Sequence, residues 1–248
     1  MSTPYQDAQR AGQDAVRTTI LDRSIDLLVS EGPAALTMRR IAADIGASTK
    51  VLYTMFGGKE GLIDALYREG FARLRRAQEA VPRDGDPLAH LTRLGQAYRA
   101  HALAEPAYYR VMFEQPVPDF HPSPEALSVA EGAFETSAAA VGACMAAGVF
   151  RPGDARELSK LLWAASHGAV SLEIGGHFTP EEAGPRYDAL MAAVGRAFLS
   201  GVPGAGTEPG SPAGVEPPAA PDARTRPPAA SAAEPLPRTS ADGEGRPA

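Results

Sequence analysis

The segment Leu36–Phe56 has the sequence LTMRRIAADIGASTKVLYTMF and carries the signals of two short helices joined by a tight turn. Thr37 is a typical N-cap residue, whose hydroxyl can accept a hydrogen bond from a free backbone N–H in the first turn of a helix. Ile41 and Ile45 lie four residues apart, on one face of the first predicted helix. Gly46 follows at the sharp turn, because glycine adopts a positive φ with little strain.

The second predicted helix begins after the capping residue Ser48 and runs from Thr49 to about Met55. Its outward side is expected to carry four hydrogen-bonding residues, Thr49, Lys50, Tyr53 and Thr54. Two short helices joined through a glycine turn, the second with a polar outer face, have the geometry that fits a DNA major groove. An ordinary helical hairpin needs the same cap, turn and apolar seam, so these features alone leave both interpretations open.

Composition and charge limit the class of protein. The chain has 248 residues, of which 44% are hydrophobic and 22% charged, as in a soluble globular protein. A net charge of −6 argues against a generally basic, non-specific nucleic-acid binder. Between Arg17 and Lys59, however, six basic residues stand against four acidic ones, a local balance of +2 where phosphate contacts would need it.

Cysteine usage and the N-terminal sequence predict the compartment. Cys144 is the single cysteine and cannot form an internal disulfide, so we expect a reducing cytoplasm, with association to the nucleoid when DNA is bound. The N-terminus lacks the apolar core of a signal peptide, and no apolar run is long enough to span a bilayer, so no membrane partner is expected.

The hydrophobic pattern beyond the motif is helical throughout, and no segment shows β-branched alternation. The predicted fold class is therefore all-α, with an N-terminal three-helix helix-turn-helix domain, a C-terminal helical ligand-binding and dimerisation domain, and a disordered C-terminal tail. Besides the motif, helices are expected over about 14–31, 59–80, 87–105, 108–114, 124–147, 154–175 and 180–200.

Breaks in this pattern predict the domain boundaries. We expect a flexible N-terminus at 1–13, the helix-turn-helix domain at 14–58, a connecting helix at 59–82 and a regulatory and dimerisation domain at 83–202. The remaining segment, 203–248, contains 11 Pro and 6 Gly and no aromatic residue. Such a segment cannot bury enough apolar surface to offset the entropy of ordering, so we predict disorder there.

Several residues stand at the positions of a known DNA-binding domain, and together they make the stretch from Ile20 to Leu66 resemble that of the tetracycline-repressor (TetR) family. Thr54 and Met55 depart from the family, whose members often carry Tyr or His there, and Gly58 replaces the more common Ser or Asp cap. These departures leave the operator sequence unpredicted. The matching residues are Thr37, Arg39, Ile41-Ala42, Gly46, Ser48, Leu52-Tyr53, Phe56, Lys59, Glu60 and Leu62.

The partner that this resemblance implies is double-stranded operator DNA, and its contacts divide by role. Residues on the two motif helices and just after them are candidates for phosphate contacts, which position the protein, or for base contacts, which read sequence. Arg40 suits either role, and Ser48 belongs to the same surface. The phosphate candidates are Thr37, Arg39, Tyr53 and Lys59, and the base candidates are Thr49, Lys50 and Thr54.

A second constellation begins at Trp163, in the sequence WAASHGAVSLE, and resembles the WHG-type C-terminal domain of one branch of these regulators. The stretch 98–113 fits the same branch. We expect Trp163 in the core and also as a pocket wall. His101 and His167 lie beside apolar residues, where a histidine is more often a core residue than a ligand contact, so both interpretations are kept.

The resemblance implies a repressor that an unidentified small apolar ligand releases from its operator. A mostly apolar cavity with a few polar groups is the usual form of such a site. The resemblance also implies a homodimer through the last two helices, because two-fold pairing presents two recognition helices to one operator. The candidate pocket residues are Tyr98, His101, Phe113, Phe134, Met145, Trp163 and His167.

Other classes of function are less favoured. A nucleophile needs a base and an orienting partner, and Cys144 lies in an apolar helical context that would keep it inert. The five histidines show no metal-ligand spacing, and no glycine-rich phosphate loop is present, so neither catalysis, cofactor nor metal is expected. The alternatives are a helical binding or scaffold module with a vestigial helix-turn-helix and, less favoured, a small-molecule enzyme.

Overall fold

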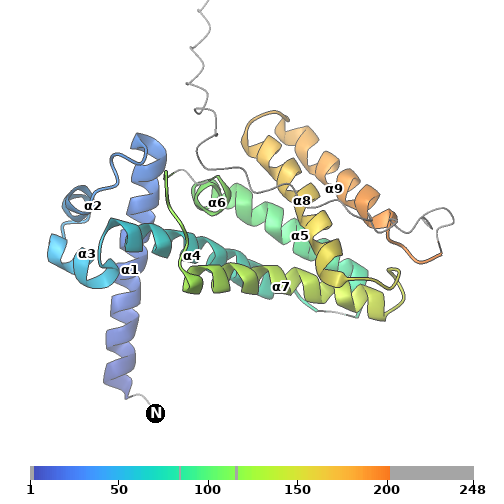
Figure 1. Ribbon diagram of the computed structural model, residues 1–248, viewed down its shortest axis with the longest axis horizontal. Helices are drawn as coiled ribbons and strands as arrows, with labels where there is room; N and C mark the ends of the chain where they lie inside the picture. Colours follow the sequence, from blue (N-terminus) through green and yellow to red (C-terminus); the bar gives the residue numbers. More distant parts are fainter. Residues whose placement is uncertain (1–2, 84, 115–116, 202–248) are drawn as a thin grey trace, which may run out of the picture. The chain divides into compact units, whose positions relative to one another are not determined.

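The computed structural model describes residues 3–83, 85–114 and 117–201. In these ranges the chain forms α-helices joined by short loops (Figure 1), with no strand beyond one isolated antiparallel bridge between Phe150 and Leu199. The predicted all-α class is confirmed. The predicted disordered tail, 203–248, lies outside the described residues.

The N-terminal part of the chain, which we call the head, consists of three helices whose caps follow the sequence signals. The hydroxyl of Thr37 accepts from the backbone N–H of Arg40 at 3.2 Å, and Gly46 has a φ of +66°, as predicted for the turn. Ser48 occupies the N-cap position of the second motif helix, but its side chain makes no capping hydrogen bond. The helices of the head are α1 (Pro4–Glu31), α2 (Met38–Asp44) and α3 (Thr49–Phe56).

The first helix begins at Pro4 rather than at Asp14, so residues 4–13 are helical where no helix was predicted from the sequence. Thr3 and Gln6 form a capping box: the Thr3 hydroxyl accepts from the Gln6 N–H, and the Gln6 side chain accepts from the Thr3 N–H. Pro4 sits at the first helical position, where its missing N–H costs nothing. These local signals start the helix although its first turns are exposed and bury no apolar face.

The connecting helix α4 (Lys59–Glu79) starts so close to the end of α3 that one of its residues has no room for a side chain. A Cβ atom on Gly61 would lie 2.0 Å from the carbonyl oxygen of Phe56, far inside contact distance. Phe56 is the last residue of α3, and its ring is buried in the core of the head. The direction in which α4 leaves the head therefore depends on Gly61.

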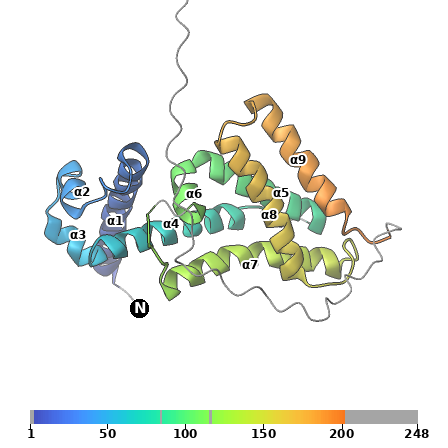
Figure 2. The same cartoon turned by 45° about the horizontal axis from the view of Figure 1, so that its top comes forward.

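The remaining helices form what we call the body, in which α4 packs beside α7, and α8 beside α9 (Figures 1 and 2). No helix in the described ranges has the length and apolar character needed to cross a membrane. Besides α4, the helices of the body are α5 (Pro87–Ala104), α6 (Pro106–Phe113), α7 (Pro124–Ala146), α8 (Ala155–Ile174) and α9 (Pro180–Arg196).

The short helix α6 contributes to two separate hydrophobic clusters. Tyr108 and Val111 belong to the cluster of the head, together with buried residues of α1 to α4. Tyr109 and Met112, one position further along, belong to the central cluster of the body. Because residues three apart share a helix face and adjacent residues do not, α6 lies between the two cores and is packed by both.

Substituting Gly61→Ala should lower the free energy of unfolding by roughly 1–3 kcal/mol, because the added methyl group forces the α3–α4 corner to shift. Gly12→Ala is the matched control: Gly12 lies in exposed helix with nothing within 4 Å of an added Cβ, so stability should not fall. Urea unfolding followed by far-ultraviolet circular dichroism measures both. Equal stabilities for the two variants would contradict the close approach of Gly61 to Phe56.

Candidate nucleic-acid interface and ligand cavity

The second motif helix, α3, is held by its apolar side and leaves its polar side exposed. Leu52 and Phe56 are buried in the core of the head. This anchoring fixes the rotation of the helix about its axis. The predicted outward orientation of the four polar residues is confirmed, and their contacts with DNA stay a prediction. The exposed residues are Thr49, Lys50, Tyr53 and Thr54.

Two cationic side chains of the motif helices α2 and α3 have no partner inside the protein among the described residues. Arg39 and Lys50 are exposed, and neither the Arg39 guanidinium nor the Lys50 ammonium has a hydrogen bond or ion pair among the described residues. The hydroxyl of Thr54 donates to the carbonyl oxygen of Lys50 at 2.8 Å, which leaves its oxygen lone pairs and its methyl group for an outside partner. Cations without internal partners are the groups that can bind phosphate or base acceptors without first breaking a contact.

Two other predicted DNA contacts are already engaged inside the head. Arg40 pairs with Glu31 at 3.0 Å and with Asp44 at 3.5 Å. The ammonium of Lys59 donates to the carbonyl oxygen of Pro33 at 3.0 Å. These pairs are exposed, so each contributes little to stability and could be exchanged for a phosphate.

A cavity of about 780 Å³ opens among α4, α5, α6, α7 and α8. Four of the predicted pocket residues line it: Tyr98, Phe113, Phe134 and Trp163. Met145 does not; it packs against the cluster around Val141 and Phe150, at the far end of α7. His101 is not among the lining residues either, and faces the charged residues Glu105, Arg73 and Arg76.

His167 lies behind the cavity wall and is held by two tyrosines. The hydroxyl of Tyr109 is 2.8 Å from Nδ1 of His167, and that of Tyr98 is 3.2 Å from the same atom. Burial lowers the pKa of His167 and raises that of Tyr109 to about 12, so at neutral pH a neutral imidazole lies beside a protonated phenol. Its ring packs against Phe113 and Trp163. His167 thus supports the wall from behind.

Trp163 departs from its predicted place in the core. Its side chain is 41% exposed, and it lines both the larger cavity and a second one of about 520 Å³ among α5, α8 and α9. The cysteine behaves as predicted, since Cys144 is fully buried and burial raises the pKa of its thiol.

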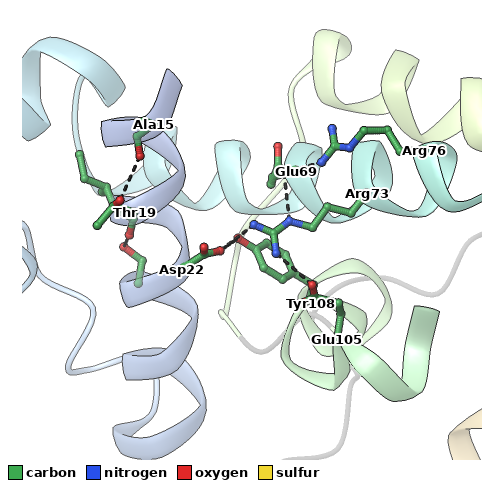
Figure 3. Close-up of polar contacts among 10 residues, drawn as sticks. Ala15, Thr19, Asp22, Glu69, Arg73, Arg76, Glu105 and Tyr108 are labelled. Atoms are coloured by element: carbon green, nitrogen blue, oxygen red, sulfur yellow. Dashed lines mark hydrogen bonds and ion pairs between the residues drawn. The ribbon is translucent and has the colours of Figure 1, made fainter. Parts of the chain in front are cut away.

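Arg73 of α4 joins the head to the body, and nothing in the sequence singled it out (Figure 3). Its guanidinium donates to Asp22 of α1 at 2.6 Å, to Glu69 of α4 at 3.0 Å and to Glu105, which caps α6, at 3.1 Å. The group also lies 4.3 Å from the ring centroid of Tyr108, whose hydroxyl donates to Asp22 at 3.1 Å. We call these five residues the Arg73 cluster.

Two family models match the chain. The model described as "Bacterial regulatory proteins, tetR family" matches residues 20–66, which include α2, α3 and the start of α4. The model described as "Tetracyclin repressor-like, C-terminal domain" matches residues 91–194, in the segment where the second resemblance was drawn.

Curated relatives and solved structures agree with these models. The chain is 25% identical over 203 residues to the HTH-type transcriptional regulators Rv1816 of Mycobacterium tuberculosis and Mb1846 of Mycobacterium bovis, covering 68% of this chain and 85% of each relative. In fold, it resembles the TetR family transcriptional regulator PfmR from Thermus thermophilus, with a TM-score of 0.56, 20% identity, and coverage of 71% of this chain and 97% of PfmR.

Substituting Arg73→Met should lower the free energy of unfolding by about 2–3 kcal/mol, because it leaves carboxylates of three elements without their shared donor. Arg75→Met is the control on the same helix. Among the described residues Arg75 pairs only with Glu79, four residues away and exposed, so its loss should cost less than about 0.5 kcal/mol. Thermal unfolding of both variants measures the difference, and equal melting temperatures would rule out a structural role for the Arg73 cluster.

Proposed function

Because the chain belongs to the tetracycline-repressor family of helix-turn-helix transcriptional regulators, we propose that it is a repressor that a small apolar molecule releases from its operator. The observation that carries the DNA-binding role is the exposed polar face of α3, held in place by the buried Leu52 and Phe56. This face can enter a major groove while α2 crosses the phosphate backbone. Cytoplasmic residence belongs to the same proposal.

The proposed DNA contacts are assigned from the side chains that are exposed and from those that lack an internal hydrogen bond or ion pair. Lys50, on the exposed face of α3, donates to base edges, with Thr49 and Thr54 beside it. Arg39 projects from α2 without an internal partner and is assigned to phosphate. The remaining contacts to the backbone of the duplex come from Thr37, Arg40, Ser48, Tyr53 and Lys59.

The proposed dimer uses an apolar face that the described part of the chain leaves uncovered. On α8, Leu161 and Leu172 are 54% and 45% exposed, and Ala164 and Gly168 lie between them on the same face at three- and four-residue spacings. Nothing lies within 4 Å of a Cβ built on Gly168, so another helix can approach closely there. Leu190 adds exposed apolar surface on α9. A second copy of the chain is the occupant that gives DNA two recognition helices.

The proposed release mechanism uses α4 and α6, which both line the larger cavity and both reach the head. On α6, Met112 and Phe113 line the cavity, and Tyr108 packs in the head and donates to Asp22. A ligand that binds one conformation of the cavity more tightly than another shifts the population toward that conformation and its position of the head. The loss of DNA affinity is limited by the ratio of the ligand's affinities for the two conformations.

Two other classes remain as alternatives, a helical scaffold module and a small-molecule enzyme. The relatives named above are regulators, which favours regulation over catalysis. A gel shift with the region upstream of the protein's own gene separates the classes. Binding that survives competitor DNA supports the regulator, whereas absence of binding by a folded protein supports the scaffold.

Substituting Lys50→Ala should weaken operator binding roughly tenfold or more, because a base contact is lost. Arg39→Ala should weaken binding to all sequences alike and reduce the slope of log affinity against log salt by about one. Arg75→Ala removes the same charge from the body and should leave affinity unchanged. Fluorescence anisotropy with labelled operator DNA measures all three, and a Lys50→Ala protein that binds like wild type would refute the assignment.

The double variant Leu161→Glu/Leu172→Glu should be monomeric, because two carboxylates would be buried in the proposed dimer contact. Leu103→Glu provides the control: Leu103 is an exposed leucine of α5, outside the proposed interface, and its variant should stay dimeric. Sedimentation velocity at micromolar concentration distinguishes the two. The interface is wrong if both variants sediment as the wild type does.

A further inference from the structure

The larger cavity contains a polar atom whose hydrogen-bonding capacity is unused. Gln78 of α4 lines this cavity and is only 4% exposed. Its Nε2 donates to the hydroxyl of Ser137 on α7 at 3.2 Å, but its Oε1 is buried without any partner among the described residues. A buried amide oxygen without a donor has lost its hydrogen bonds to water without forming any within the protein. Because this costs free energy, such atoms are rare in folded proteins. Because Gln78 lines the cavity, a donor group on a bound molecule that reaches this oxygen would supply the missing hydrogen bond.

The rest of the cavity wall is mostly apolar and rich in aromatic rings. Flat aromatic walls favour a ligand that can stack or pack edge-on against them. The volume of about 780 Å³ is that of a site for a drug-sized molecule. The rings at the wall include Phe71, Tyr98, Phe113, Phe120, Phe134 and Trp163.

The charges around the cavity disfavour an anionic ligand. No lysine, arginine or histidine is among its described lining residues, and Glu131 is the one carboxylate there. Arg156 lies 5.3 Å from the ring centroid of Phe134, but it is already paired with Glu131 and Glu135. A ligand carboxylate in this cavity would lose its hydration without gaining a free cation.

We infer that the effector is an uncharged, largely aromatic molecule carrying a hydroxyl or amide N–H that donates to Oε1 of Gln78. This inference rests on the proposed ligand-responsive function and adds the chemical class of the ligand and the atom that recognises it. Gln78 lies on α4, the helix that also carries Arg73, so a ligand held by Gln78 acts on the helix that is bonded to the head.

Three probes with the same two rings test the class of ligand: para-phenylphenol, its methyl ether, and the corresponding biphenyl carboxylate. Trp163 is the only tryptophan in the sequence and lines the cavity, so its fluorescence reports binding to the full-length chain without DNA. The phenol should bind about tenfold more tightly than the ether, which has no donor, and the carboxylate should bind most weakly.

Two variants test the recognising atom. Gln78→Met keeps the length of the side chain and removes the acceptor, so the phenol and the ether should bind equally, and the melting temperature should not fall. Ser159→Ala is the matched control, because the buried Ser159 hydroxyl also lacks a partner among the described residues but lines the smaller cavity. This variant should keep the preference for the phenol.

Four results would overturn the inference: no fluorescence response to the phenol, tightest binding of the carboxylate, a phenol preference that persists in Gln78→Met, or one that disappears in Ser159→Ala. Anisotropy with operator DNA tests the proposed function separately. If the phenol binds with the expected preference but never lowers DNA affinity, ligand release is wrong and the recognition by Gln78 stands. If an anionic molecule releases the protein from DNA, the proposed ligand release stands and the recognition by Gln78 is wrong.

Discussion

The partly buried guanidinium of Arg73 constrains how the head is attached to the body. Its three acceptors come from α1, from α4 itself and from the residue that caps α6. Removing an acceptor from a partly buried cation costs free energy. These three elements therefore stay together, or their hydrogen bonds to Arg73 are broken and replaced at the same time. An attachment made of directional bonds favours discrete arrangements of the head and body over gradual displacement.

Packing along α6 reinforces this attachment. Tyr108 belongs to the core of the head, and its neighbour Tyr109 belongs to the core of the body and bonds to His167. A displacement of the cavity wall at Phe113 is carried by the same short helix to Tyr108. Because packed cores resist gradual deformation, the head must follow or the contact must break. The same short helix α6 therefore contributes to the cavity wall, to the Arg73 cluster and to the core of the head.

The sequence by itself determined the features whose causes are local. Thr37 caps α2, Gly46 takes the positive φ of the turn, and the apolar residues of α3 set which side of that helix is exposed. The all-α class followed from periodicity, and the family followed from anchor residues at fixed spacing. The early start of α1 was also encoded locally, in the capping box of Thr3 and Gln6, and the prediction overlooked it.

Only the tertiary structure decided which helix each apolar face meets. Periodicity indicates that a face is buried but not against what, so Met145 and His101 fit a pocket in the sequence and lie outside it in the structure. Arg73 and Asp22 are 51 positions apart, and Gln78 and Ser137 are 59 apart. Bonds over such separations, and a buried oxygen left without one, arise from the packing of whole helices, which no local pattern specifies.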